Sequence, residues 1–455
     1  MGAKTITSFD PSRELALEIL ERVERQGAFA SHELNHAFAA VATLAVDVRP
    51  RRAFTSELVY GTLARRGRID WSLARAVARG LDSVQPRTLT LLRLAVYELL
   101  FLGDVPEHAS VHTAVELARR RIHPSQAKFV NAVLRTVLRR LTEEPDELAA
   151  RTSHPQWIVD LYRRLLPEDE LVAALEANND RPPLTIRARG ARAELAAELA
   201  SLGFTLHDGR LAPNALIVEN PEGLFETQLF LTGAFVAQDE AAQLVGELAA
   251  PRTGELVVEI GAGLGGKTTH LAELSGGGAR ILALDTHAGR LRRLEERAAA
   301  LGLRAIETRR QDATAPLESW SDPLAASVDC VVIDAPCSGL GVLRRQPEIR
   351  WRRDREAIAI YAARQRQMIE RAGELLRPGG RLIYAVCTVT DEEGPRRIRE
   401  AIDSGRFERL PTAELVNTAG SRLPSEIVTA EGDLRTWPHR DRVDGFFISR
   451  LRATH

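Results

Sequence analysis

A glycine-rich segment that could bind a phosphate or a nucleoside follows the apolar run Leu256–Ile260. Its sequence is Gly261-Ala262-Gly263-Leu264-Gly265-Gly266-Lys267-Thr268. It matches both the GxGxxG fingerprint of dinucleotide sites and the P-loop pattern, GxxxxGK followed by Ser or Thr. With Glu259 it also matches the acidic-x-GxGxG pattern of sheets that bind S-adenosylmethionine. In each case a tight glycine turn leads into a helix whose first N–H groups receive the ligand, so the motif alone leaves three alternatives.

Acidic residues near the ends of strand-like runs help to choose between these alternatives. Asp285 could accept hydrogen bonds from ribose hydroxyls, Asp312 could bind an adenine amino group, and Glu259 could bind the amino group of a cationic tail. A triphosphate needs cations instead, and Lys267 is the only lysine in this half of the chain. Asp334 could serve a P-loop enzyme as its second acid, but Asp285 and Asp312 would then have no role. The pattern favours S-adenosylmethionine.

Two of the three cysteines also come directly after strand-like runs. Cys337 stands in the sequence DAPCSGLG, and Cys387 follows RLIYAV. A thiolate that adds to C6 of a pyrimidine turns C5 into a nucleophile that can take a methyl group. Asp334 could stabilise charge near N3, and the target base must leave its stack to enter the site. The two cysteines beside a methyl donor therefore predict methylation of C5 of a pyrimidine.

A parallel sheet would bring these residues together. From Gly254 the chain alternates strand-like and helical runs in the βαβ manner. The expected strands are 256–260, 280–285, 305–309, 329–334 and 381–386, with 446–451 as a last, antiparallel strand. Helices are expected over 290–301 and 355–376. Ligands of such sheets bind beyond the carboxyl ends of the strands, where the candidate residues cluster.

The rest of the chain predicts two further parts. Residues 1–140 carry helical periodicity without strand-like alternation. The expected helices there are 14–24, 55–66, 89–102, 111–121 and 127–141. Two more helices, 154–166 and 169–179, lead into a small mixed α/β subdomain with strands at PLTIRA and ALIVE and a helix between them.

Charge is unevenly distributed along the chain. The net charge is −1, yet residues 49–140 contain 17 basic and 7 acidic residues. Only three of the 61 basic residues are lysines, which we attribute to compositional bias of the genome. The clustering is a separate observation, because a basic block on a folded segment is a candidate footprint for nucleic acid.

Length and composition exclude several classes of protein. The chain has 455 residues, 44% hydrophobic and 27% charged, which predicts two to four folded domains and excludes disorder throughout. The sequence has no run of about 18 apolar residues and no secretory signal at its start. The cysteines form no CxxC pair, and Cys330, inside a strand pattern, is expected in the core. We expect a soluble, cytoplasmic, multidomain protein.

Several of these motifs together resemble a known family. DAPCSGLG, GGKTTHL, LIYAVCT and WPHRDRVDGFFISR resemble the RNA cytosine-5 methyltransferases. RRAFTSELVYGTLARRGRIDWSL and AKFVNAVLR resemble the NusB-like RNA-binding domain. The combination is typical of the bacterial ribosomal small-subunit methyltransferase B family. The resemblance implies an all-α NusB-like domain over 1–145, linker helices with a small α/β subdomain over 146–250, and a Rossmann-like methyltransferase domain over 251–455.

The resemblance also implies an activity and roles for single residues. The family methylates C5 of a cytosine in 16S ribosomal RNA, so the implied partner is that RNA, free or in a pre-subunit particle. Cys387 maps to the nucleophile and Cys337 to the residue that assists product release, whereas DNA cytosine methyltransferases would make Cys337 the nucleophile. The cofactor site maps to Glu259, Asp285, Asp312, Asp334 and the glycine segment from Gly261 to Lys267.

The sequence departs from the family at two points. The family's glycine motif usually reads Asp-x-Cys-Ala-Ala-Pro-Gly-Gly-Lys, and here it reads Glu-Ile-Gly-Ala-Gly-Leu-Gly-Gly-Lys. Val386 replaces the threonine that usually precedes the nucleophile.

Two other functions fit parts of the sequence. An RNA-binding protein with an inactive methyltransferase domain and a P-loop nucleotide hydrolase are the alternatives. His32-Glu33-Leu34-Asn35-His36 matches a zinc-protease pattern, but a surface helix explains it. The arginines at 344, 345, 350, 352 and 353 fit RNA contact or a solvated face equally well.

Overall fold

The computed structural model describes residues 10–41, 49–320, 324–411 and 424–454. The chain forms two compact units. The first comprises Met1–Arg181 and Leu343–Arg352, and the second comprises Pro182–Val342 and Arg353–His455. The first nine residues, part of the segment searched for a secretory signal, lie outside the described ranges. Within those ranges no helix combines the length and apolarity needed to cross a bilayer.

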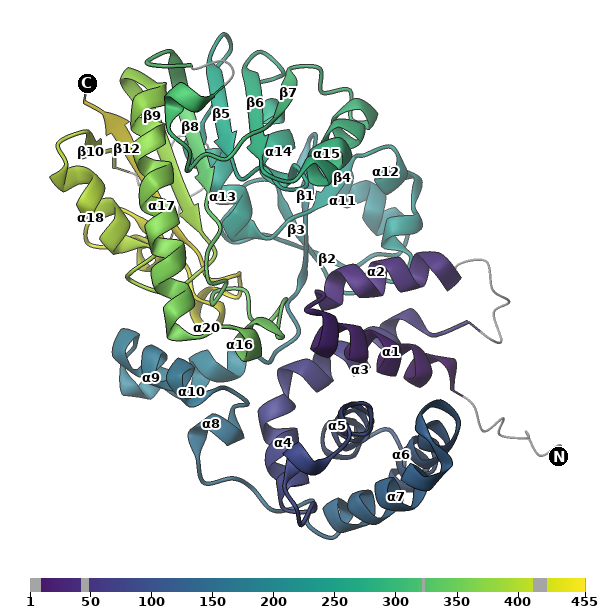
Figure 1. The fold of residues 1–455 in the computed structure, drawn as a ribbon. Helices are drawn as coiled ribbons and strands as arrows, with labels where there is room; N and C mark the ends of the chain where they lie inside the picture. The colour runs from purple at the N-terminus through teal and green to yellow at the C-terminus, as the bar shows by residue number, and fades with distance from the viewer. Residues whose placement is uncertain (1–9, 42–48, 321–323, 412–423, 455) are drawn as a thin grey trace. The chain divides into compact units, whose positions relative to one another are not determined.

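The first unit consists of helices, as its periodicity predicts (Figure 1). Up to residue 140 the α-helices are α1 (Pro11–Gln26), α2 (Ala30–Val41), α3 (Arg52–Ala64), α4 (Arg66–Ala74), α5 (Pro86–Phe101), α6 (Glu107–Leu117) and α7 (Pro124–Leu138). Helix α1 begins where Asp10 accepts a hydrogen bond from the Ser12 N–H, and it ends at Gly27, which is left-handed. Helix α5 is buried along most of its length because the other helices of the bundle surround it. This confirms the expected helical domain.

Four shorter helices complete the unit. They are α8 (Leu148–Arg151), α9 (Gln156–Leu165), α10 (Glu168–Ala177) and α16 (Ile349–Arg352). The last of these comes from the segment that follows Cys337 in the sequence. The prediction for its arginines is wrong for Arg350, which is fully buried rather than solvated or available to RNA.

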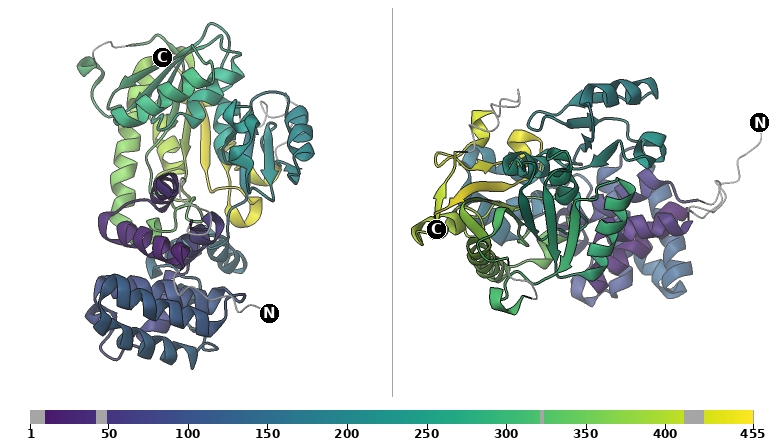
Figure 2. Two further views of the ribbon diagram at one scale, coloured as in Figure 1. Left: turned by 90° about the vertical axis from the view of Figure 1, so that its right-hand side faces the viewer. Right: turned by 90° about the horizontal axis from the view of Figure 1, so that it is seen from above.

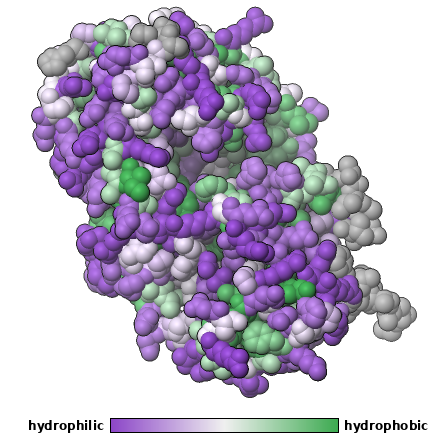
Figure 3. Space-filling view, viewed as in Figure 1, coloured by the Kyte–Doolittle hydropathy of each residue, from purple (hydrophilic) through white to green (hydrophobic). Residues whose placement is uncertain are grey.

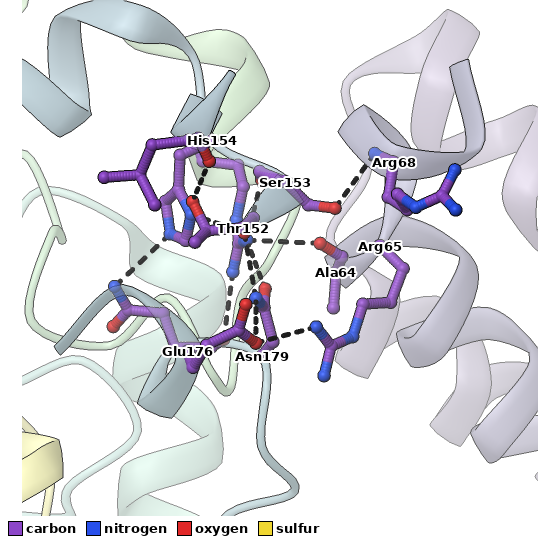
Figure 4. A network of polar contacts seen from close by, with 11 residues as sticks. Ala64, Arg65, Arg68, Thr152, Ser153, His154, Glu176 and Asn179 are labelled. Atoms are coloured by element: carbon purple, nitrogen blue, oxygen red, sulfur yellow. Dashed lines mark hydrogen bonds and ion pairs between the residues drawn. The ribbon is translucent and has the colours of Figure 1, made fainter. Parts of the chain in front are cut away.

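Arg350 is held by oxygen atoms from three parts of the unit. Its guanidinium donates hydrogen bonds to the carbonyl oxygens of Ala64, Ser153 and Asn178, at 2.9–3.2 Å, and to Oδ1 of Asn179 at 2.7 Å. Figure 4 shows Ala64, Ser153 and Asn179 turned towards a common point. Burial lowers the pKa of Arg350 to about 9, so the side chain is still charged at neutral pH.

A small antiparallel sheet opens the second unit. Its strands lie in the order β2-β3-β1-β4, and helix α11 (Arg192–Ser201) packs against it. The strands are β1 (Leu184–Ala188), β2 (Leu206–Asp208), β3 (Ala215–Val218) and β4 (Phe235–Ala237). Only β1 and β3 were predicted, because β2 and β4 have three residues each and show too little periodicity to be recognised.

The larger sheet contains the predicted strands. Its order is β10-β12-β9-β8-β5-β6-β7, with β11 paired to β12. The parallel strands are β5 (Leu256–Ile260), β6 (Arg280–Asp285), β7 (Ile306–Arg310), β8 (Val328–Asp334) and β9 (Leu376–Val386). The antiparallel strands are β10 (Phe407–Arg409), β11 (Leu434–Arg435) and β12 (Phe447–Ala453). The chain order reverses at β5, where β6 lies on one side and β8 on the other, and such a switch point opens a ligand crevice.

Helices cover both faces of this sheet (Figure 2). They are α13 (Glu240–Ala249), α14 (Gly266–Leu274), α15 (Ala288–Ala300), α17 (Arg355–Leu375) and α18 (Pro395–Asp403). Val258 faces α17 and α18, whereas the preceding residue of the strand, Val257, faces α13 and α14. Cys330 is fully buried within β8, as expected. The view in Figure 3 is largely hydrophilic, with scattered apolar side chains.

Candidate active site

The glycine segment is fixed by its backbone at the carboxyl ends of three strands. Gly261 and Gly265 have φ angles of 84° and 80°, which favour glycine. A Cβ atom on Gly261 would collide with the backbone carbonyl of Asp334. The Gly263 N–H donates to Asp285 at 3.0 Å. Helix α14 then begins at Gly266, so its free N–H groups lie where β5, β6 and β8 end.

The acids at these strand ends fit S-adenosylmethionine. Burial raises the pKa of Glu259 to about 8, and neither of its carboxyl oxygens has a hydrogen bond of normal geometry within the described residues. An ammonium group would satisfy this buried carboxyl. Asp285 accepts N–H bonds from Gly263 and His287, which leaves lone pairs for ribose hydroxyls. Asp312 is exposed beyond β7 and bonds to the neighbouring Thr314.

Lys267 lies beside Asp334 rather than standing free in the glycine segment. Its Nζ is 2.6 Å from Oδ2 of Asp334. Burial lowers the pKa of Lys267, but Asp334 together with Glu259 and Cys387 raises it above its ordinary value. A P-loop needs its lysine for phosphate, so this pairing disfavours a triphosphate site. Cys387 also acts electrostatically on Lys267, which brings three candidate residues into one cluster.

The two strand-end cysteines are in contact. The sulfur atoms of Cys337 and Cys387 lie 3.3 Å apart, and both residues are half-buried. The hydrogen bond to Cys387, together with burial, raises the pKa of Cys337 well above its ordinary value. Cys337 is therefore a thiol at neutral pH and can donate a hydrogen bond to the sulfur of Cys387.

Residues that sequence reasoning missed hold the two cysteine loops together. The Gly341 N–H donates to the carbonyl of Cys387 at 3.1 Å, and the Gly445 N–H donates to the carbonyl of Gly341 at 2.8 Å. A Cβ atom on Gly341 would collide with the Gly445 carbonyl. Gly341, the second glycine of DAPCSGLG, could have indicated such a close approach. Glu393, which bonds to both loops, belongs to no sequence motif that would have indicated its role.

The zinc-protease pattern does not form a metal site. Glu33, its acidic residue, pairs with Arg22 at 2.7 Å. Across the described ranges no group of three or more His, Cys, Asp or Glu side chains is arranged to hold a metal ion.

Comparison with known proteins matches every part of this architecture. Family models match over residues 10–139 (NusB family), 154–224 (RsmF/B-like ferredoxin-like domain) and 247–452 (16S rRNA methyltransferase RsmB/F). A probable ribosomal RNA small subunit methyltransferase B of Bacillus subtilis is 31% identical over 453 residues, 97% of this chain and 98% of the relative. The ribosomal RNA small subunit methyltransferase B of Vibrio cholerae is 31% identical over 93% of this chain and 94% of its own.

Solved structures agree with these relatives. The crystal structure of PH0851 superposes with a TM-score of 0.82 at 25% identity, covering 97% of this chain and 99% of the other. The chain therefore belongs to the ribosomal RNA small subunit methyltransferase B family and is an S-adenosylmethionine-dependent methyltransferase.

Proposed function

We propose that the chain methylates C5 of a cytosine in 16S ribosomal RNA, and that the thiolate of Cys387 adds to C6 of that base. The carrying observation is the contact between Cys337 and Cys387, in which Cys337 keeps its proton. The pKa of Cys337 is raised well above its ordinary value by this contact and by burial, so Cys337 is the poorer source of the nucleophilic thiolate, and Cys387 stands at the position that the resemblance assigns to the nucleophile. The names of the relatives and of the matching family model support 16S ribosomal RNA as the substrate.

The reaction divides into addition, methyl transfer and elimination. Bond formation between Cys387 and C6 moves an electron pair onto the ring, and the Asp334–Lys267 pair is the polar group available to stabilise this charge near N3. S-adenosylmethionine supplies an electrophilic methyl group, which C5 attacks. Loss of the C5 proton to a base then re-forms the double bond and expels the Cys387 thiolate.

Cys337 fits the role of that base. In the free protein its pKa is raised first by the hydrogen bond to Cys387 and then by burial. Once the sulfur of Cys387 is bonded to C6 as a neutral thioether, the hydrogen bond that raised the pKa of Cys337 is weakened. Cys337 then gives its own proton to solvent water, and the resulting thiolate takes the C5 proton, so that Cys337 ends the step as a thiol again.

A trapping experiment tests the proposal. Cys337→Ala, incubated with 16S RNA and S-adenosylmethionine, should accumulate an RNA–protein adduct that survives denaturation, because addition continues and elimination stops. Cys387→Ala should form no adduct. Cys330→Ala, which changes the cysteine buried in β8, is the matched control and should turn over without accumulating the adduct.

Other outcomes would overturn specific parts of the proposal. An adduct with Cys387→Ala but not with Cys337→Ala would make Cys337 the nucleophile. No adduct and no methylated RNA with the wild-type chain would favour an RNA-binding protein with an inactive methyltransferase domain. Sequencing that detects 5-methylcytosine in the product identifies the base.

A further inference from the structure

Glu393 is a completely buried carboxylate that takes no part in the chemistry described above. It lies just beyond β9, in the turn that precedes α18. Its Oε1 accepts hydrogen bonds from the Ser338 N–H at 2.8 Å and from Nε2 of Gln365 at 3.2 Å. Its Oε2 accepts from the hydroxyls of Ser338 at 2.5 Å and Thr390 at 2.9 Å. Every one of these partners is a donor, which suits an ionised carboxylate.

The partners of Glu393 are the chain neighbours of both cysteines. Ser338 directly follows Cys337, and Thr388 directly follows Cys387. The hydroxyls of Ser338 and Thr388 are 2.8 Å apart, and the Thr388 hydroxyl is 3.4 Å from Oε2 of Glu393. One carboxylate thus joins the two loops within a single residue of each sulfur atom.

Helix α17 is tied into the same network. Nε2 of Gln365, which is fully buried, donates both to Glu393 and to the carbonyl oxygen of Pro336 at 3.0 Å. Pro336 directly precedes Cys337, so the Cys337 loop is held on both sides of its sulfur. Tyr384 of β9 adds a bond from its hydroxyl to the Glu393 carbonyl at 2.6 Å.

The buried hydrogen bonds of Glu393 hold the two cysteine loops in one arrangement. Burial raises the pKa of Glu393, while hydrogen bonds from Ser338, Thr390 and Gln365 lower it and offset part of the burial. Removing the carboxylate would leave these buried donors without an acceptor, which is costly. The bonds therefore favour one arrangement of the two loops over others.

We propose that Glu393 is a positioning residue that holds Cys337 and Cys387 in contact through Ser338, Thr388 and Gln365. Its side chain is fully buried, and it acts by fixing the distance between the two sulfurs. This inference rests on the proposed function for its effect on catalysis, but the positioning itself can be measured without any methylation.

The first test measures the sulfur–sulfur contact directly. Diamide oxidises two thiols to a disulfide and is itself reduced to the hydrazine, so the rate of Cys337–Cys387 cross-linking reports how often the sulfurs meet. Glu393→Ala should slow this rate at least about tenfold, and Glu393→Gln should slow it less because its amide oxygen still accepts from Ser338. Glu392→Gln, which alters the neighbouring glutamate outside the network, is the matched control and should react as the wild type does.

The second test measures adduct formation in the Cys337→Ala background. Glu393→Ala should lower the rate of adduct formation by about 100-fold, as expected for a misplaced nucleophile, with S-adenosylmethionine affinity and the KM for RNA unchanged. Ser338→Ala, which removes the hydroxyl bonds to Glu393 and Thr388 but keeps the carboxylate and the Ser338 N–H bond, should give an intermediate rate. It guards against a Glu393→Ala chain that fails to fold.

The two tests separate the possible failures. Unchanged cross-linking in Glu393→Ala, with retained cofactor affinity, would overturn the positioning role whatever the activity. Slower cross-linking would support it even if the wild-type chain forms no adduct, a result that would contradict the proposed function alone.

Discussion

Glu259 is a single side chain that should make cofactor binding depend on pH. Its pKa of about 8 is raised by burial, so below that pH the free protein holds the neutral carboxyl. The ammonium group of S-adenosylmethionine is bound by the ionised form, so binding must release a proton. Between about pH 6 and 7.5 the dissociation constant should therefore fall as the pH rises, by at most tenfold per unit. Calorimetry in buffers with different ionisation enthalpies measures both the dissociation constant and the number of protons released on binding.

The control for this prediction keeps the shape of the side chain and removes its titration. Glu259→Gln should bind S-adenosylmethionine more weakly, and its affinity should be constant over the same pH range. An equal pH dependence in the wild type and in Glu259→Gln would assign the proton to another group.

The sequence was most informative about residues close to the end of a strand. A parallel sheet brings its carboxyl ends together, so the convergence of Glu259, Asp285 and Asp334 followed from periodicity alone. The pairing of Lys267 with Asp334 could not be predicted in this way, because it depends on where one long side chain turns. Glu393 was missed because Ser338 and Gln365, through which it reaches the Cys337 loop, are distant in sequence and share no motif with it.

At the scale of elements, the glycine segment depends on backbone geometry as much as on side chains. Gly261→Ala places a Cβ atom against the carbonyl of Asp334 at a φ of 84°, so the turn between β5 and α14 must shift. We expect S-adenosylmethionine affinity to fall by at least about tenfold, because non-glycine residues in such conformations cost of order 1–3 kcal/mol. Equilibrium binding of S-adenosylmethionine to the wild type and to Gly261→Ala measures the loss of affinity.

Gly289→Ala is the matched control for Gly261→Ala. Gly289 lies in α15, no atom lies within 4 Å of the added Cβ, and alanine favours a helix. This variant should bind the cofactor normally and be at least as stable as the wild type. If Gly261→Ala also binds S-adenosylmethionine normally, the glycine segment tolerates movement, and its proposed role in binding the cofactor is wrong.

The basic block of the helical unit is less positive in space than in sequence. Several of its arginines form ion pairs with acids that lie outside residues 49–140: Arg87 with Glu21, Arg93 with Glu24, Arg121 with Glu14, Arg75 with Glu143, and Arg65 with Glu176. Counting charges in a sequence window cannot detect this, because folding brings in acids from elsewhere. If this unit binds nucleic acid, the cations without an acidic partner are the ones that should supply the binding.

Two such cations lie on helix α7. Lys128 and Arg135 are exposed and make no ion pair within the described ranges. If the helical unit binds RNA phosphates, Lys128→Ala and Arg135→Ala should each weaken binding equally for RNAs of all sequences. Each should also reduce the slope of the logarithm of the binding constant against the logarithm of the salt concentration by about one. Filter binding of the full chain to RNA at several salt concentrations measures the slope. Arg87→Ala, whose charge is already paired, is the comparison, and an equal loss with it would contradict the prediction.

At the scale of the whole molecule, the path of the chain could not be predicted. Residues 343–352 follow the Cys337 loop in sequence, yet they belong to the helical unit. The indole N–H of Trp351 donates to the Leu63 carbonyl at 3.3 Å, and Arg352 donates to the carbonyls of Val23 and Ala28 at 2.6 Å. Such a short segment has no periodicity of its own, and arginines are ordinarily exposed, so its sequence gave no indication of burial.

Arg350 is the residue on which the docking of this segment most depends. Its removal leaves the carbonyls of Ala64, Ser153 and Asn178 buried without a donor. We therefore expect Arg350→Ala to destabilise the helical unit by about 3 kcal/mol. Because a chain of two units need not unfold in one step, hydrogen exchange of the α3, α8 and α10 peptides is a sharper measurement than a melting temperature.

The control and the contradicting result follow from the same geometry. Arg79→Ala, which removes an exposed arginine of the same unit, should leave exchange unchanged. Arg350→Lys should restore only part of the protection, because one ammonium cannot reach oxygens that a planar fork spans. Faster exchange confined to peptides around Ala64, Ser153 and Asn178 would support the anchoring role. Exchange equal to that of Arg79→Ala would instead mean that packing of the segment, and not its buried guanidinium, holds residues 343–352 in the helical unit.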